Sequence, residues 1–291
     1  MDEITLKALA KINLGLDVVR RREDGYHEVR MIMQTIHLYD LLEIQKIREP
    51  GIQIVSNLSF LPVNENNLVY KAARLLQEEF ALTDGISVKL TKRIPVAAGM
   101  AGGSSNAAAV LYGMNQMFRL GLSQNELMER GVKLGADVPY CIMRGTVLAE
   151  GIGEKLTQLP PMIKCPVLIA KPSISVSTRF VYQNLKLDEQ TNHPDIDALM
   201  KDIREKDFDG VCAHMGNVLE SVTIPNYPVI AEIKQQMMRS GAKASMMSGS
   251  GPTVFGLFED GETAKRALRE MKRSGLAKQV YLTTIYNNRR K

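Results

Sequence analysis

A stretch rich in glycine and serine in the middle of the chain has the residue types of an anion-binding loop. It covers residues 95–107 and reads Pro-Val-Ala-Ala-Gly-Met-Ala-Gly-Gly-Ser-Ser-Asn-Ala. Ser and Asn are common at helix starts and Ala favours helices, so the pattern predicts a glycine loop that leads into a helix. Glycines let the backbone approach a ligand closely, and the first turn of a helix presents unpaired N–H groups. The combination favours a phosphate site over a loop that serves packing alone.

This loop differs from the two common phosphate-binding loops. The chain contains neither G-x-x-x-x-G-K-[ST] nor G-x-G-x-x-G, so it predicts neither an ordinary P-loop nor a Rossmann-type dehydrogenase. Residues 103–107 are close to the nucleophile elbow of hydrolases, but the final glycine is missing. The phosphate prediction therefore depends on the glycines and the helix start themselves.

Two charged side chains lie in apolar surroundings. Lys11 and Asn13 alternate with apolar residues in a strand predicted over 4–19, so they face the same side. The lysine either reaches water as an edge-strand gatekeeper or has an anionic partner, and the sequence supports both equally.

Asp137 stands in a short segment bounded by glycine and proline. It is either a helix cap or, if it faces the phosphate loop, an acceptor for a hydroxyl proton.

Length and composition indicate a globular protein with one large domain or two ordinary ones. The 291 residues are 45% hydrophobic, and 37 basic against 32 acidic residues give a formal charge of +5. The short basic clusters at 20–22 and 289–291 have no interleaved aromatic residues, so no nucleic-acid partner is predicted. The sequence shows no signal-peptide pattern and no long apolar run, which predicts no membrane partner. Three scattered cysteines predict reduced thiols and a cytoplasmic location.

The predicted elements fall into two regions that meet near 158–164, where Pro160-Pro161 interrupts the pattern. Before this point strands are predicted at 4–19, 26–36, 41–47, 52–55, 86–90 and 145–153, and helices at 64–80, after the glycine loop, and behind Ser123. After it come a strand at 167–171, helices at 175–184, 195–204, 207–215 and 228–240, and an ending of strand, glycine turn, strand, helix and strand over 242–284. That ending predicts a ferredoxin-like sandwich.

Three segments, in this order along the chain, resemble the GHMP small-molecule kinase superfamily, whose glycine–serine loop replaces a P-loop. They are Ala10-Lys11-Ile12-Asn13-Leu14, residues 95–107 and Met247-Ser248-Gly249-Ser250-Gly251-Pro252. Further matches at 24–28, 66–70 and 134–139 narrow the resemblance to members whose acceptor is a cytidine diphosphate of a sugar alcohol. Met100 stands where such members often have leucine. The resemblance covers essentially the whole chain.

The resemblance implies an α+β fold, the two-domain GHMP kinase fold. Its N-terminal α/β domain, of the ribosomal protein S5 domain 2-like type, would cover residues 1–160. Its C-terminal ferredoxin-like α/β sandwich would cover residues 161–291.

The resemblance also implies a reaction and the residues that carry it out. ATP, with Mg²⁺, would phosphorylate a hydroxyl of the acceptor, with Asp137 as general base and Lys11 as a cation beside the reacting groups. The acceptor would be bound by Asn13, by Tyr26 and Tyr182 stacking on cytosine, and by His27 at the edge of the base. The residues implied for ATP are Pro95, Val96, Ala97, Ala98, Gly99, Met100, Ala101, Gly102, Gly103, Ser104 and Ser105, with Asn66 and Lys92 on the adenine side. Ser104 and Ser105 would lie nearest the phosphates and the metal, no protein ligand of the metal is assigned, and a monomer or weak homodimer is expected.

Two other functions are compatible with the sequence. Another kinase of the same superfamily, of the homoserine or mevalonate type, would differ mainly on the acceptor side, and a panel of hydroxyl acceptors with ATP separates these kinases. A non-catalytic protein that holds a nucleotide would use Asp137 as a cap and Lys11 as a gatekeeper. Such a protein would bind ATP without consuming it.

Overall fold

The computed structural model describes residues 1–288, and the basic cluster at 289–291 lies outside the described residues. The chain forms two compact units. The first comprises residues 1–10, 38–96 and 101–143, and the second comprises 11–37, 97–100 and the chain from 144 onward. The strands β1 (Glu3–Arg21) and β2 (His27–Ile47) contribute residues to both units. The domain limits at 160 and 161 stay a prediction.

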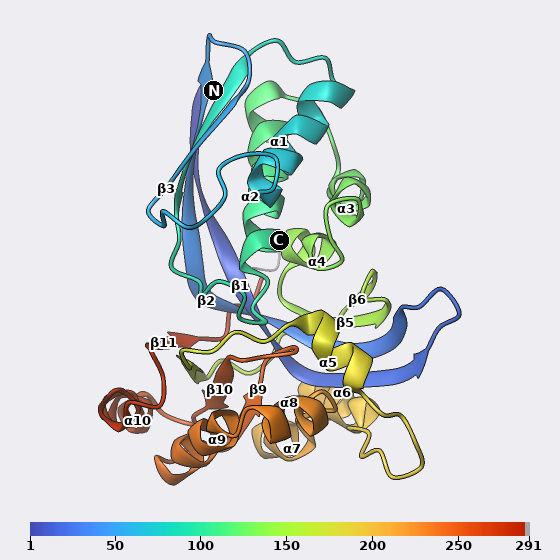
Figure 1. Cartoon of the computed structure of the whole chain (residues 1–291), viewed down its shortest axis with the longest axis vertical. Helices are drawn as coiled ribbons and strands as arrows, with labels where there is room; N and C mark the ends of the chain where they lie inside the picture. Colours follow the sequence, from blue (N-terminus) through green and yellow to red (C-terminus); the bar gives the residue numbers. More distant parts are fainter. Residues whose placement is uncertain (289–291) are drawn as a thin grey trace. The chain divides into compact units, whose positions relative to one another are not determined.

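The first unit is a layer of strands covered by helices on one face (Figure 1). Strand β4 (Gly85–Thr91) pairs in parallel with β3 (Ile52–Ser56) and antiparallel with residues 41–47 of β2. Its alternate residues Ile86, Val88 and Leu90 are buried, as the period of a half-buried strand requires. The helices are α1 (Leu68–Glu79), α2 (Gly102–Phe118), α3 (Gln124–Val132) and α4 (Val138–Met143). Helix α2 packs against α1, α3 and α4, which makes it the central helix of this unit.

The second unit contains a four-stranded antiparallel sheet in the order β11-β7-β10-β9. Its strands are β7 (Pro166–Lys171), β9 (Ala244–Met247), β10 (Val254–Leu257) and β11 (Gln279–Thr284). Helices α9 (Val229–Arg239) and α10 (Gly261–Ser274) pack on this sheet and on each other, so they lie on the same face (Figure 1). This order and layering confirm the predicted ferredoxin-like sandwich.

The rest of the second unit extends from the strands it shares with the first. Strand β5 (Thr146–Gly151) pairs with residues 29–34 of β2 and with β6 (Lys155–Gln158), and β8 (Gly216–Asn217) pairs in parallel with β1. The remaining helices are α5 (Thr178–Asn184), α6 (Ile196–Glu205), α7 (Phe208–His214) and α8 (Glu220–Asn226). Within residues 1–288, no helix is both long and apolar enough to cross a bilayer.

The structure differs from the predicted elements at several places. The strands predicted at 26–36 and 41–47 form one continuous strand, β2. The strand can include the buried Asp40 because the carboxylate of this residue accepts hydrogen bonds from the backbone N–H groups of Arg93 and Ile94. Helix α8 was not predicted, since it contains Pro225. Helix α2 is not capped by a Ser or Asn side chain. It begins at Gly102 after Ala101, whose left-handed φ of 54° ends the loop, and the two serines lie inside its first turns.

Candidate active site

Within the second unit, three segments that are far apart in the sequence meet. The backbone N–H of Lys11 donates to the carbonyl oxygen of Met100 over 3.2 Å. The Ser248 hydroxyl donates to the carbonyl oxygen of Gly99 over 2.9 Å. A Cβ atom on Gly249 would lie 3.4 Å from that same Gly99 oxygen. The glycine turn near the end of the chain therefore supports the part of the glycine loop that belongs to this unit.

Gly99 shows why this loop requires glycine. Its φ is +70°, in the left-handed region that side chains disfavour. A Cβ at this position would lie 2.1 Å from the carbonyl oxygen of Ser248, which is far inside van der Waals contact. Any side chain at Gly99 would separate the loop from the turn that supports it.

The Lys11 side chain is buried. The residue is only 5% exposed, and its Nζ donates to Oδ1 of Asn13 over 2.7 Å. Asn13 is fully buried, and its Nδ2 lies 3.3 Å from the Met31 sulfur. Because Lys11 is buried and its backbone N–H is bonded to Met100, it does not have the exposed, unpaired position of an edge-strand gatekeeper. Asn13 instead orients a buried cation, a role beyond the acceptor contact predicted for it.

Asn217 is a site-supporting residue that sequence reasoning missed. Its Nδ2 donates to the carbonyl oxygens of Met247 and Gly249 over 2.9 and 2.8 Å, and its Oδ1 accepts from the Leu219 N–H over 3.0 Å. Its two amide donor bonds thus hold the glycine turn, and its amide oxygen holds the backbone that follows β8. One asparagine at the end of a two-residue strand carries no signal in the sequence, because the turn that it holds lies about 30 residues later.

Two of the three aromatic residues predicted for the acceptor lie together in the second unit. The ring centroids of His27 and Tyr182 are 5.1 Å apart, with the planes tilted by 44°. Burial, with a smaller contribution from the charge of Arg21, lowers the pKa of His27 below its ordinary value. Tyr26 is 61% exposed, and its ring makes no ring contact with residues 1–288. The structure therefore pairs His27 with Tyr182 and leaves Tyr26 at the turn.

The start of helix α2, in the first unit, is open to a ligand at its second residue. Gly103 is exposed, and a Cβ there would meet only a Leu68 methyl group, at 3.5 Å. The N–H groups in the first turn of a helix have no intrahelical acceptor, and they carry the positive end of the helix dipole. Ser105 is different, because its N–H donates to Ala101 and its hydroxyl donates to the Leu9 carbonyl oxygen over 2.7 Å. The donors available to a phosphate at this helix end are thus those of residues 102–104, and those of Ser105 have protein partners.

Asp137 immediately precedes helix α4, and its carbonyl oxygen accepts from the Cys141 N–H over 3.0 Å. The residue is half-buried, and α4 packs against α2 in the first unit. Asp137 therefore lies at the start of a helix, where a cap is expected. The helix that follows Asp137 contacts the phosphate-loop helix, so the two alternatives for Asp137 do not exclude each other.

The two residues predicted for the adenine side have different surroundings. Asn66 is exposed in the turn before α1, where its N–H donates to the Asn64 side chain over 3.2 Å. Lys92 is buried, and its ammonium is paired with Asp40. Its backbone N–H and carbonyl are both bonded to the side chain of Asn57, at 2.7 and 3.2 Å. The Lys92 ammonium is thus paired in the protein interior, and the ATP contact of Lys92 stays a prediction.

Comparisons with known proteins agree with this arrangement. The family model for the GHMP kinase N-terminal domain matches residues 67–145, and that for the GHMP kinase C-terminal domain matches residues 199–277. A 4-diphosphocytidyl-2-C-methyl-D-erythritol kinase from Lachnospira eligens is 57% identical over 98% of this chain and 99% of its own. The chain therefore belongs to the GHMP kinase family and is a kinase.

Solved structures give the same result at the level of the fold. A crystal structure of 4-(cytidine 5'-diphospho)-2C-methyl-D-erythritol kinase superimposes with a TM-score of 0.85 and 30% identity, over 98% of this chain and 100% of that one. A homoserine kinase from Cytophaga hutchinsonii superimposes with a TM-score of 0.79 but only 21% identity, over 98% and 95% of the chains. The second similarity shows a shared fold, whereas the first extends to the sequence.

Proposed function

We propose that this kinase transfers the γ-phosphoryl group of ATP to the C2 hydroxyl of 4-diphosphocytidyl-2-C-methyl-D-erythritol. The products are the 2-phosphate and ADP, and the step belongs to non-mevalonate isoprenoid precursor biosynthesis. The observation that carries the proposal is the full-length, 57% identity to a kinase named for this acceptor. The His27–Tyr182 pair supports it, because two adjacent rings suit a planar cytosine.

On the donor side, we propose that residues 95–105 wrap the triphosphate, with the N–H groups of the first α2 turn directed at it. Gly99 and Met100 are bonded to Ser248 and Lys11, so this part of the loop is held in place before ATP binds. Preorganised donors lose less freedom on binding than mobile ones do. Asn66 and Lys92 stay proposed contacts on the adenine side.

In the proposed reaction, the Asp137 carboxylate accepts the proton of the C2 hydroxyl. The hydroxyl oxygen forms a bond to the γ-phosphorus, the bond from that phosphorus to the β–γ bridging oxygen breaks, and ADP leaves with the electron pair. Lys11, oriented by Asn13, stabilises the negative charge on the oxygens of the transferred group. Phosphoryl transfer needs positioning and charge neutralisation more than covalent catalysis, and these two residues supply both.

The residues present fit a Mg²⁺ ion that is bound together with ATP. Among residues 1–288, no group of three or more His, Cys, Asp or Glu side chains could hold a metal. Mg²⁺ usually keeps several waters and uses substrate phosphates with one or two protein oxygens. Ser104 in the first turn of α2 and Asp137 before α4 provide oxygens on two helices in contact. The ion, when bound, neutralises charge on the phosphates.

The proposal extends to the substrate, the location and the partners of the enzyme. Its acceptor is a small molecule, its location is the cytoplasm, and neither nucleic acid nor a membrane takes part. It works as a monomer or a weak homodimer.

The decisive experiment measures ADP release with ATP and a panel of acceptors. We expect release only with the cytidylylated methylerythritol, and none with homoserine or mevalonate. Release with one of these other alcohols would identify a different kinase of the family. Tight ATP binding with no release for any acceptor would favour the non-catalytic alternative.

Replacing Tyr182 by alanine should raise KM for the acceptor about 5- to 100-fold, because one stacking partner of a base contributes roughly 1–3 kcal/mol. KM for ATP should stay within about twofold. Tyr182→Phe keeps the ring next to His27 and should retain most of the acceptor affinity. Steady-state kinetics with each substrate varied in turn makes the comparison, and an unchanged acceptor KM for Tyr182→Ala would remove this ring from the cytosine site.

His27 should bind the acceptor in its neutral form. Its pKa in the folded protein lies below the ordinary 6.5, so the ring is neutral at pH 7 and becomes protonated only as the pH falls through the lowered value. A neutral imidazole has one donor and one acceptor, whereas the protonated ring has two donors. We therefore expect acceptor KM to rise below pH 6.5 in the parent enzyme and to stay flat in His27→Gln. A midpoint above 6.5 would contradict this assignment.

A further inference from the structure

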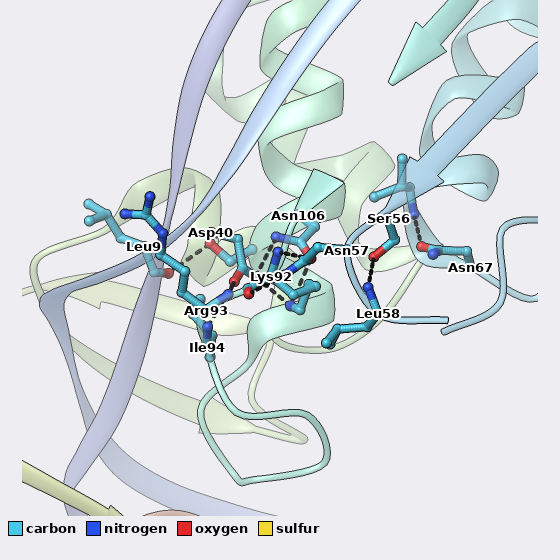
Figure 2. A network of polar contacts seen from close by, with 12 residues as sticks. Leu9, Asp40, Ser56, Asn57, Leu58, Asn67, Lys92, Arg93, Ile94 and Asn106 are labelled. Carbon is cyan, nitrogen blue, oxygen red and sulfur yellow. Dashed lines mark hydrogen bonds and ion pairs between the residues drawn. The ribbon is translucent and has the colours of Figure 1, made fainter. Parts of the chain in front are cut away.

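The first unit contains a buried ion pair to which no catalytic role has been given. Asp40, near the middle of β2, is fully buried, and the Lys92 side chain just after β4 is 4% exposed. Asn106, in α2, is 2% exposed and completes the cluster (Figure 2). We refer to these three residues as the Asp40 cluster.

Each oxygen of the Asp40 carboxylate accepts two hydrogen bonds in this cluster. Oδ1 of Asp40 accepts from the backbone N–H groups of Arg93 and Ile94, over 2.7 and 2.8 Å. Its Oδ2 accepts from Nδ2 of Asn106 over 2.8 Å and from the Lys92 ammonium. Lys92 also donates to Oδ1 of Asn106 over 3.0 Å.

These partners lie at the two ends of the phosphate loop. Arg93 and Ile94 directly precede Pro95, where the loop begins. Asn106 lies in α2, just after the first-turn N–H groups proposed to bind phosphate. Asp40 thus connects the entry of the loop with its exit, and Figure 2 shows both sets of contacts converging on it. The Lys92 ammonium also lies under the helix start, since a Cβ on Gly102 would be 3.1 Å from it.

Stability is a weak explanation for this arrangement. Taking two charges out of water costs several kcal/mol for each ion, and a well-packed apolar pair at such a place is often equally stable or more so. The same two strands carry another ion pair, Glu43 with Lys89, on their exposed side. That pair spans the same ladder between exposed side chains, which makes it a natural comparison.

We propose that Asp40, through Asn106 and Lys92, is a positioning residue for ATP: it fixes the spacing between the two ends of the phosphate loop, and so holds the helix N–H groups in place for the triphosphate. This inference rests on the proposed function, because it takes the loop as the triphosphate site. Fixing the loop in advance removes the ordering cost that ATP binding would otherwise carry. The acceptor does not require this loop geometry, so its affinity is independent of the cluster.

Two variants and one control test this role. Asp40→Asn leaves the Lys92 ammonium without its counter-charge. Asn106→Leu keeps the Asp40–Lys92 pair but cuts its link to α2. Glu43→Gln removes the exposed pair from the same two strands. Each protein is tested by thermal melting, by calorimetric binding of a non-hydrolysable ATP analogue, and by KM for each substrate.

We expect Asp40→Asn and Asn106→Leu to raise the Kd for the ATP analogue and the KM for ATP at least tenfold. The KM for the acceptor should stay within about twofold of the parent value. Glu43→Gln should change none of these three constants. If Asp40→Asn does not fold, Asn106→Leu decides the result, because it leaves no buried charge unpaired. Lowered melting temperatures with unchanged ATP binding, or equal rises in both KM values, would overturn the proposal. Binding of the analogue does not depend on phosphoryl transfer, so it tests the role of Asp40 separately from the proposed function. A parent enzyme that binds the analogue but never releases ADP would refute only the proposed function.

Discussion

Replacing Asp137 by asparagine should lower kcat about 10²- to 10⁴-fold while KM for both substrates stays within about threefold. A positioned general base typically contributes this factor, and the amide cannot accept the hydroxyl proton. Asn is about as good as Asp at the start of a helix, so the substitution preserves whatever support the residue gives to α4. A loss of kcat at constant KM is the signature of an interaction made only in the transition state.

Asp260→Asn is the matched control for this experiment. Asp260 caps α10 through the N–H groups of Glu262 and Thr263, at 2.8 and 2.9 Å, so it too precedes a helix. We expect this variant to keep its turnover. If Asp137→Asn also turns over at the parent rate, Asp137 is a helix cap and the base is another group.

The second large effect is expected for Lys11→Met, which removes a buried cation but keeps an unbranched side chain of similar length. A cation about 4 Å from an anionic group gains roughly 4 kcal/mol at an effective dielectric constant near 20. That free energy corresponds to about three decades in rate. The loss should appear in kcat at saturating ATP and acceptor, measured by ADP release.

Lys11→Met also removes the donor to Oδ1 of Asn13, so some loss of stability is expected. Thermal melting measures that loss separately and shows whether the variant is folded at the assay temperature. Lys7→Met is the control, because Lys7 lies on the same strand but is exposed, with its ammonium 4.6 Å from the ring centroid of Tyr39. Turnover within tenfold of the parent for Lys11→Met would show that the cation acts mainly through structure.

Most of the helices and strands, and the class of protein, could be predicted from the order of the residues. Their signals are local: the Ser123 capping box at α3, the Asn67 cap at α1, and the strand alternation around Lys11 all depend on residues a few positions apart. The glycine loop was recognisable because glycine is required wherever the backbone comes too close for a side chain, as at Gly99. The ferredoxin-like ending followed from the order of such local elements.

Which polar side chains are available to a ligand could be seen only once the chain was folded. Lys92 and Ser105 have the residue types of phosphate contacts, yet the ammonium of one is paired with Asp40 and the hydroxyl of the other is bonded to Leu9. Their partners lie 52 and 96 residues away along the chain. A hydrogen bond depends on distance in space, and sequence patterns report neighbours along one helix or strand. The residue types were therefore predictable, but their partners, and with them the roles of Asn217 and Asp40, were set by the packing of distant segments.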